Sequence, residues 1–242
     1  MSATNRGADR YELDDYPTPA WCVHRLLDRV RFDGNRWYEP CAGDGSIIRA
    51  VNSHHSMAGR KIEWSANEIQ PKYEAQLRRQ VPLVTIADLR AVTFALPQPY
   101  DVYISNPPFS IAQEVAEIGF HVATTVILLL RINFYGSKHR HPWISNRIPA
   151  KTGVLPDRPA FRLSKTTGKL GTDATEYAWF CWQRPFKRSA GELFLLDLTD
   201  PDVLEEDRTR IRGKGRKANG KPVEEHPRYD DFVEDLKDDL RK

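Results

Sequence analysis

The sequence YDVYISNPPF, residues 100–109, joins an apolar stretch to a polar loop with two consecutive prolines. Aromatic and β-branched residues dominate the stretch from Tyr100 to Ile104, which predicts a strand. Two prolines remove two N–H donors and restrict the backbone, so Asn106-Pro107-Pro108-Phe109 is predicted to form a stiff loop. A buried strand with a rigid polar loop at its carboxyl end is therefore expected here.

The same transition from strand to polar residue recurs on both sides of this segment. Predicted strands cover residues 61–67, 83–87 and 126–130, and a further short strand ends at Trp37-Tyr38. Predicted helices alternate with them over residues 19–30, 46–51 and 71–79, and over a face formed by Ile111, Val115, Ile118 and Val122. Alternating strands and helices predict an α/β fold with a doubly wound, mostly parallel, Rossmann-like sheet.

Two helix starts are predicted from capping patterns. Thr18 is expected to be an N-cap with Pro19 at the first helical position. Ser110 and Gln113 have the spacing of a capping box, which predicts a helix beginning just after Ser110.

Polar side chains stand at the carboxyl ends of the predicted parallel strands. Glu39, Glu68, Asp88 and Asn106 each follow one strand, far apart in the sequence. Ligands of open α/β sheets bind outside the carboxyl ends, where the strand order reverses. The four residues are therefore expected to line one crevice.

The glycine-containing loop EPCAGDG, residues 39–45, is the expected cofactor loop. It lacks the third glycine of a dinucleotide fingerprint and the Gly-Lys-Ser/Thr of a phosphate-binding loop. Gly43 and Gly45 allow a ligand to approach the backbone closely. Glu39 could pair with an ammonium group, Glu68 with ribose hydroxyls and Asp88 with an adenine amino group. S-adenosylmethionine (SAM) has these three parts and no phosphate.

The proline loop can position an amino group for methylation. The Asn106 side-chain oxygen and the Pro107 carbonyl are two acceptors that could hold both protons of an amine, and Phe109 offers a face for a flat base. Catalysis would then depend on positioning and electrostatics, without a metal or a covalent intermediate. Pro40-Cys41 could be mistaken for the nucleophile of a cytosine-C5 methyltransferase, but that cysteine belongs after the strand that Asn106 follows.

Basic residues are concentrated in two stretches. Residues 131–171 contain nine Lys/Arg and one acid, and residues 208–221 contain seven Lys/Arg and no acid, although the whole chain has a net charge of only +3. Such segregation indicates a polyanionic partner. The candidate nucleic-acid-binding residues are Arg131, Lys138, Arg140, Arg147, Arg208, Arg210 and Arg212.

The remaining composition indicates a cytoplasmic protein. No apolar run is long enough to cross a membrane, and residues 1–15 lack the apolar core of a secretory signal. Three cysteines without metal-ligand spacing fit a reducing compartment. His54-His55 and His139-Arg140-His141 have no carboxylate or cysteine partner at useful spacing, so no metal site is expected.

The domain organisation follows from the same patterns. Residues 1–15 are expected to be flexible and residues 16–200 to form the catalytic domain, with 131–171 as a basic DNA-binding insertion. Predicted strands at 177–182 and 192–196 indicate a C-terminal antiparallel addition. Residues 201–242 are expected to be a charged tail, with a linker up to 228 and then an amphipathic helix carrying Tyr229, Phe232, Val233, Leu236 and Leu240.

These motifs resemble those of SAM-dependent amino-methyltransferases. Glu39-Pro40 with Gly43-Asp44-Gly45 resembles the SAM-binding motif, and Asn106-Pro107-Pro108-Phe109 resembles the catalytic (D/N)PP(Y/F/W) motif. Residues 15–19, DYPTP, resemble the N-terminal SAM-binding segment of adenine-specific DNA methyltransferases of phage and prophage type, and residues 173–179 resemble a late segment of those enzymes more weakly.

The resemblance covers about residues 12–185 and implies a function. It implies a SAM-methyltransferase fold, SAM as cofactor, and methyl transfer to N6 of adenine in duplex DNA after the base is flipped out. It also implies that Tyr16 and Thr18 contact the methionyl part of SAM. The chain departs from the family in having no large target-recognition domain.

Three alternatives share these motifs. The substrate could be an RNA adenine or guanine, since the same proline loop occurs in RNA amino-methyltransferases. A protein glutamine is a further candidate, although the two basic stretches disfavour a small protein target. The third alternative is a regulator that binds SAM or nucleic acid without catalysis.

Overall fold

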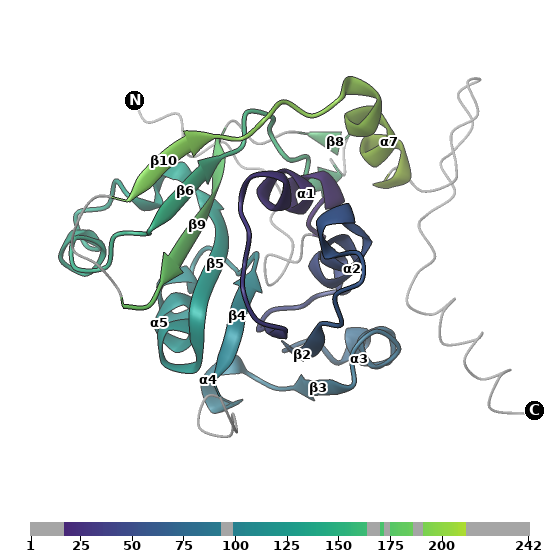
Figure 1. Ribbon diagram of the computed structural model, residues 1–242, viewed down its shortest axis with the longest axis horizontal. Coiled ribbons are helices and arrows are strands. Elements are labelled where there is room, and N and C mark those ends of the chain that lie inside the picture. The colour runs from purple at the N-terminus through teal and green to yellow at the C-terminus, as the bar shows by residue number, and fades with distance from the viewer. Residues whose placement is uncertain (1–16, 93–98, 164–169, 172–174, 186–190, 212–242) are drawn as a thin grey trace, which may run out of the picture.

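A computed structural model describes residues 17–92, 99–163, 170–171, 175–185 and 191–211 (Figure 1). The strands are β1 (Arg36–Glu39), β2 (Glu63–Glu68), β3 (Leu83–Ile86), β4 (Tyr100–Ser105), β5 (Ala123–Arg131), β6 (Lys151–Val154), β7 (Arg162–Leu163), β8 (Leu170–Gly171), β9 (Tyr177–Gln183) and β10 (Glu192–Leu195). The α-helices are α1 (Ala20–Arg29), α2 (Ser46–Ser53), α3 (Glu74–Arg78), α4 (Leu89–Val92), α5 (Ala112–Val122), α6 (His141–Ile144) and α7 (Pro201–Ile211). Short 3-10 helices are η2 (His55–Met57), η3 (Pro71–Tyr73) and η5 (Ile132–Phe134).

The main sheet has eight strands in the order β10-β6-β9-β5-β4-β1-β2-β3. All neighbouring pairs are parallel except those of β9, which runs antiparallel to both β5 and β6. The chain leaves β1 towards β2 and β3, then returns to build β4 and β5 on the other side of β1. The order therefore reverses between β1 and β4, and the expected doubly wound, mostly parallel α/β fold is confirmed.

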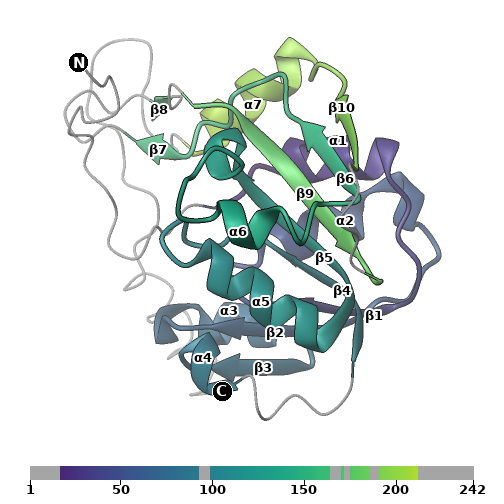
Figure 2. The same ribbon diagram turned by 90° about the vertical axis from the view of Figure 1, so that its left-hand side faces the viewer.

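Two apolar layers enclose the sheet. Along β5, Ile127 and Leu129 belong to the core beneath α1 and α2, whereas Val126, Leu128 and Leu130 belong to the core beneath α5. Successive side chains of a strand point to opposite faces, so a strand covered on both sides is apolar throughout. Figures 1 and 2 show α1 and α2 on one face of the sheet and α5 and α6 on the other.

Both predicted capping patterns are wrong in detail. The first helix begins at Ala20 with Pro19 as its N-cap residue and no side-chain cap, because the Thr18 hydroxyl bonds elsewhere, to Asn106. The helix after the proline loop begins at Ala112 with Ile111 as its N-cap residue, also without a side-chain cap. There the Ile111 N–H donates to the Pro108 carbonyl at 3.1 Å, so a turn of the loop separates Ser110 from the helix.

The expected C-terminal antiparallel part is present as β9, and the C-terminal part differs from expectation in three details. Strand β6 lies inside the main sheet, so residues 131–171 include part of the core. Strand β10 runs parallel to β6, and β9 supplies the antiparallel element.

The expected linker after residue 200 begins instead with α7, because the Asp200 carboxylate accepts the Asp202 N–H at 2.8 Å and Pro201 fits the first helical turn. Residues 1–15 and the amphipathic segment 229–240 lie outside the described residues.

None of the helices in the described part of the chain is both long and apolar enough to cross a membrane.

Candidate active site

A cavity of about 420 Å³ opens at the carboxyl ends of the parallel strands. Its walls include Glu39, Glu68, Asp88 and Asn106, the four polar residues predicted to converge. Glu39 ends β1 and Asn106 follows β4, so the cavity lies where the strand order reverses. The predicted convergence of these four residues on one cavity is confirmed.

The glycine loop is anchored by backbone hydrogen bonds. The Gly45 N–H donates to the Ala42 carbonyl at 2.8 Å, and the Ser46 N–H donates to Asp44 Oδ1 at 2.9 Å at the start of α2. Gly43 and Gly45 have φ of 51° and 77°, a left-handed conformation that side chains with a Cβ disfavour. Residues 40–44 of the loop line the cavity, whereas Gly45 does not.

Glu39 is a buried acid with an unsatisfied oxygen. The residue is 1% exposed, and its Oε2 has no hydrogen-bond partner. Burial raises the pKa of this carboxyl well above its ordinary value, with further contributions from Asp44 and Glu68. A buried carboxylate oxygen without a partner is unfavourable unless a cation or donor reaches it. The side chain is thus suited to a ligand that carries a positive charge.

Glu68 ties the end of β2 to the glycine loop. Its Oε2 accepts the Gly43 N–H at 2.7 Å, and its Oε1 accepts the Gln70 N–H at 2.9 Å. Each carboxylate oxygen has a second lone pair, so Glu68 keeps acceptor capacity towards a ligand. It can serve the loop and the cavity together.

Asp88 lies two residues beyond β3 and is held by Arg90. The Arg90 Nε lies 3.0 Å from one carboxylate oxygen and 3.1 Å from the other. The hydrogen bonds to Arg90 lower the pKa of Asp88 to about 2. A ligand that uses Asp88 as an acceptor must therefore share it with this guanidinium.

Asn106 is oriented by a residue 88 positions earlier in the chain. Its Nδ2 donates to Thr18 Oγ1 at 3.1 Å, and Thr18 is only 4% exposed. The Thr18 N–H in turn donates to Ser46 Oγ at 3.0 Å. Because the amide nitrogen is engaged by Thr18, the Asn106 Oδ1 is the end left to accept from a ligand. Pro107 is buried, and Pro108 lines the cavity with Asn106.

Phe109 is half-buried between two side chains. The Arg131 guanidinium carbon lies 4.8 Å from the centre of the Phe109 ring, and the Tyr177 ring centre lies 5.8 Å away at 43°. The ring is therefore packed against the protein, and Arg131 shares the space over it.

The predicted nucleic-acid-binding residues that the structure describes differ in their surroundings. Lys138 is exposed, Arg140 packs over Phe134, and Arg147 lies 3.8 Å from Glu117. Arg208 and Arg210 belong to α7, although their side chains are not described. Tyr16 and Arg212 lie outside the described residues.

Sequence reasoning missed Asn67, which joins three strand ends. Its Nδ2 donates to the Pro40 and Ala87 carbonyls at 3.1 and 3.2 Å, and its Oδ1 is buried without a partner. Its position directly before Glu68, at the carboxyl end of β2, is the signal that could have identified it. Ile69, 48% exposed on the cavity wall, was also missed because a lone exposed apolar residue is ordinary.

The structure also bears on the interpretation of Cys41 and on that of His54. Burial raises the pKa of the Cys41 thiol, which keeps it protonated and unsuited to nucleophilic attack. The argument that His54 has no carboxylate partner is wrong, because its Nε2 lies 3.0 Å from Asp28 Oδ1. Residue 28 is too far from residue 54 in sequence for spacing to reveal that pair.

Comparison with solved structures identifies the fold. A Listeria monocytogenes protein described as a class I SAM-dependent methyltransferase superposes with a TM-score of 0.52 and 17% identity, covering 80% of this chain and 69% of its own. The chain has the class I methyltransferase fold. A type I restriction-modification methyltransferase subunit from Streptococcus thermophilus gives 0.54 with 13% identity, over 93% of this chain and 53% of that one. A Pyrococcus horikoshii protein described as an RNA methyltransferase gives 0.51 with 15% identity, over 74% and 90%.

This chain thus spans about half the length of the streptococcal subunit. Its fold is similar both to that restriction-modification methyltransferase subunit and to a protein described as an RNA methyltransferase. No protein-family model matches the sequence, and no curated protein is significantly similar to it.

Proposed function

We propose that the chain transfers a methyl group from SAM to the N6 amino group of adenine in DNA. The orientation of Asn106 is the observation that carries this proposal. Thr18 engages the amide nitrogen, so the Asn106 oxygen is the acceptor presented at the cavity. An exocyclic amine has two protons to donate, and this acceptor suits it.

The cavity fits SAM on the chemistry of its walls. The unsatisfied, buried Glu39 Oε2 matches the ammonium of the methionyl part. Glu68 would accept from the ribose hydroxyls, and Asp88 from the adenine amino group. Ile69 offers an exposed apolar surface beside Glu68 against which the adenine could pack. Pro40, Gly43 and Gly45 would let the backbone approach the ligand, and the resemblance implies that Tyr16 contacts the methionyl part of SAM.

SAM supplies a methyl group on a sulfonium that an amine lone pair can attack. The residues of this chain position the amine. The Asn106 oxygen and the Pro107 carbonyl accept hydrogen bonds from its two N–H groups, which favours a pyramidal nitrogen and directs its lone pair. After methylation the nitrogen releases one of these protons to solvent. Pro107 and Pro108 limit motion of the loop, so both acceptors keep their positions. Oriented acceptors in a partly desolvated site lower the barrier without reorganising.

Phe109 and Arg131 would receive the flipped base. A base inside a duplex cannot reach the Asn106 oxygen, so it must leave the stack. Phe109 then offers an aromatic face, but Arg131 lies 4.8 Å over it. Either Arg131 moves aside or the base packs between its guanidinium and the neighbouring aromatic rings. In the second arrangement Arg131 contacts the target base directly.

The choice of DNA adenine rests on the N-terminal segment and the basic stretches. The DYPTP segment resembles that of adenine-specific DNA methyltransferases, and residue Thr18 of this segment contacts the proposed catalytic residue. The subunit from Streptococcus thermophilus is a restriction-modification methyltransferase, which is consistent with a DNA substrate.

Transfer of radiolabel from SAM tests the proposal. Purified protein is incubated with duplex DNA, RNA and a mixture of proteins, and methylated DNA is digested to identify the modified base. We expect label on DNA as N6-methyladenine. Asn106→Ala should abolish transfer while SAM still binds, and Asn35→Ala, at an exposed position near the opposite end of the strands, should behave as wild type. Label on RNA alone overturns the choice of DNA, and no label on any substrate overturns methyl transfer.

A further inference from the structure

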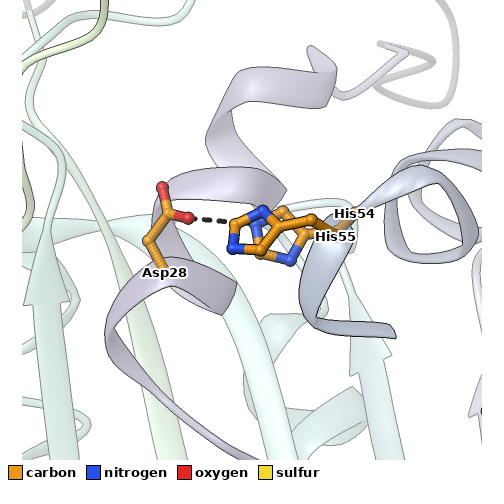
Figure 3. A group of neighbouring side chains, drawn as sticks. All are labelled: Asp28, His54 and His55. Atoms are coloured by element: carbon orange, nitrogen blue, oxygen red, sulfur yellow. Dashed lines mark hydrogen bonds and ion pairs between the residues drawn. The ribbon is translucent and has the colours of Figure 1, made fainter. Parts of the chain in front are cut away.

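A second polar cluster lies at the far end of α1 and α2 from the cavity. Asp28 is in the last turn of α1, His54 follows α2, and His55 begins η2 (Figure 3). Each offers one ligand atom, and these atoms all lie within 4.8 Å of one another. We propose that Asp28, His54 and His55 bind one Zn²⁺ ion, or a divalent cation of similar preference, that fastens α1 to the α2–η2 junction.

Two of the three ligands already have suitable separation. Asp28 Oδ1 lies 3.0 Å from His54 Nε2. Two ligands of one tetrahedral Zn²⁺, each about 2.0–2.1 Å from the metal, lie about 3.3 Å apart. The pair therefore needs only a small adjustment to share an ion. Imidazole nitrogen and carboxylate oxygen are both ordinary Zn²⁺ ligands.

Both of these ligands also form contacts through the atom that would not face the metal. The Ser56 N–H donates to His54 Nδ1 at 3.2 Å and Ser56 Oγ lies 2.7 Å from it, so the proton on Nε2 faces Asp28 and is the one that Zn²⁺ would displace. The other oxygen of Asp28 accepts from Arg25 Nη1 at 3.0 Å. Such outer contacts fix the orientation of metal ligands. His54 is 4% exposed, so its ring has little freedom to turn away.

His55 supplies the third ligand from the solvent side. Its ring centre lies 4.2 Å from that of His54, and the residue is exposed. It can turn towards the pair without disturbing the core, and water would complete the coordination. With three protein ligands and the Arg25 cation close by, the affinity should be lower than that of a four-ligand structural zinc site.

The position of the site predicts its effect. A metal here joins two segments that are separate in sequence, at the opposite end of α1 from Thr18. Its effect should appear in the stability of the fold, and it can be measured without any methyl-transfer assay. The inference is therefore independent of the proposed function.

Zn²⁺ titration of the metal-depleted full chain tests the site. We expect one equivalent to bind with Kd below about 100 µM. At about a hundredfold excess over Kd, the melting temperature should rise by roughly 5–10 °C. His55→Ala and Asp28→Asn should each lose at least about tenfold in affinity and most of the thermal shift, as expected when a metal site loses a ligand. His121→Ala, at an exposed position on α5, should match wild type.

Co²⁺ as a spectroscopic probe gives a second measurement. The Co²⁺-loaded wild-type protein should show the absorption bands of nitrogen-ligated Co²⁺. The His55→Ala variant should lose these bands although it remains folded. Absence of Zn²⁺ binding by the wild-type chain overturns the proposal. Binding that His55→Ala and Asp28→Asn leave unaltered also overturns it, because the ion then lies elsewhere.

Discussion

At the residue scale, Thr18 decides which end of the Asn106 amide faces the cavity. The hydroxyl accepts from Nδ2 at 3.1 Å, and Thr18 is almost fully buried. Thr18→Val keeps the shape and removes the hydroxyl, so the amide can turn its nitrogen towards the substrate. We expect kcat to fall by about 10- to 100-fold, because a misoriented acceptor no longer holds the amine.

The Thr18 prediction has a conservative control. Thr18→Ser retains the hydroxyl and should recover most of the turnover. Measured SAM affinity should change little in either variant. A Thr18→Val protein with weakened SAM binding and normal kcat contradicts the positioning role and places Thr18 with the methionyl part of SAM.

We expect the Glu39 side chain to lower the folding stability of the protein and to strengthen SAM binding. Burial raises its pKa in the folded protein, so the folded state holds a proton more tightly than the unfolded state. Folding stability from this group is therefore greatest below the ordinary carboxyl pKa and falls as pH rises through the raised value. Glu39→Gln removes the buried charge and should raise the melting temperature at neutral pH.

The same substitution should weaken SAM binding by about 10- to 100-fold, since a hydrogen bond to a charged group is worth about 1.5–3 kcal/mol. Wild-type affinity should rise with pH, because the ammonium of SAM favours the ionised carboxylate. Calorimetry over a pH series measures both effects. Equal SAM affinity in wild type and Glu39→Gln at high pH counts against the ammonium contact.

At the element scale, the strands were easier to predict from sequence than the helix starts. Buried parallel strands are apolar along their whole length, so segments such as 126–130 were recognisable, and the polar residues after them marked the cavity. The helix starts at Thr18 and Ser110 were wrong because the Thr18 hydroxyl bonds Asn106, and a loop turn separates Ser110 from α5. Long-range pairs such as Thr18–Asn106 and Asp28–His54 leave no periodic signal.

The two loop glycines provide a matched pair of substitutions. Both have positive φ, so alanine at either costs about 1–2 kcal/mol in backbone strain. A Cβ on Gly45 would also meet the Gln80 side chain at 2.7 Å, whereas a Cβ on Gly43 meets nothing within 4 Å. Gly45→Ala should therefore lower the melting temperature more than Gly43→Ala.

The two substitutions should rank differently in their effect on SAM binding. Gly45→Ala should cost more stability, whereas Gly43→Ala should cost more SAM affinity. Gly43 lines the cavity, so its new methyl group would occupy ligand space. Relative to its fall in melting temperature, Gly43→Ala should show the larger loss of SAM affinity of the two variants. Thermal unfolding with and without SAM measures both quantities, and a proportional loss in the two variants contradicts a ligand seated on Gly43.

At the scale of the whole molecule, the two ends of the sheet have different chemistry. The carboxyl ends carry the cavity with its acids and Asn106. Arg31, Lys61 and Arg79 lie in connections leading to the opposite ends of β1, β2 and β3, and all three are exposed. Exposed basic residues are thus present at the end of the sheet opposite the cavity, and the net charge of the chain alone does not identify a nucleic-acid surface.

Neutralising Arg208, Arg210 and Arg212 together tests whether the basic C-terminal stretch contacts phosphates. Each phosphate contact adds about 0.9 to the slope of log affinity against log salt for duplex DNA. The triple alanine variant should reduce the slope by about 2–3 and weaken binding at low salt to all sequences alike. The matched triple variant of Arg31, Lys61 and Arg79 removes the same charge near the amino ends of β1, β2 and β3 and should leave the slope nearly unchanged. Equal losses in the two variants indicate a general charge effect, which excludes a defined phosphate-binding arm.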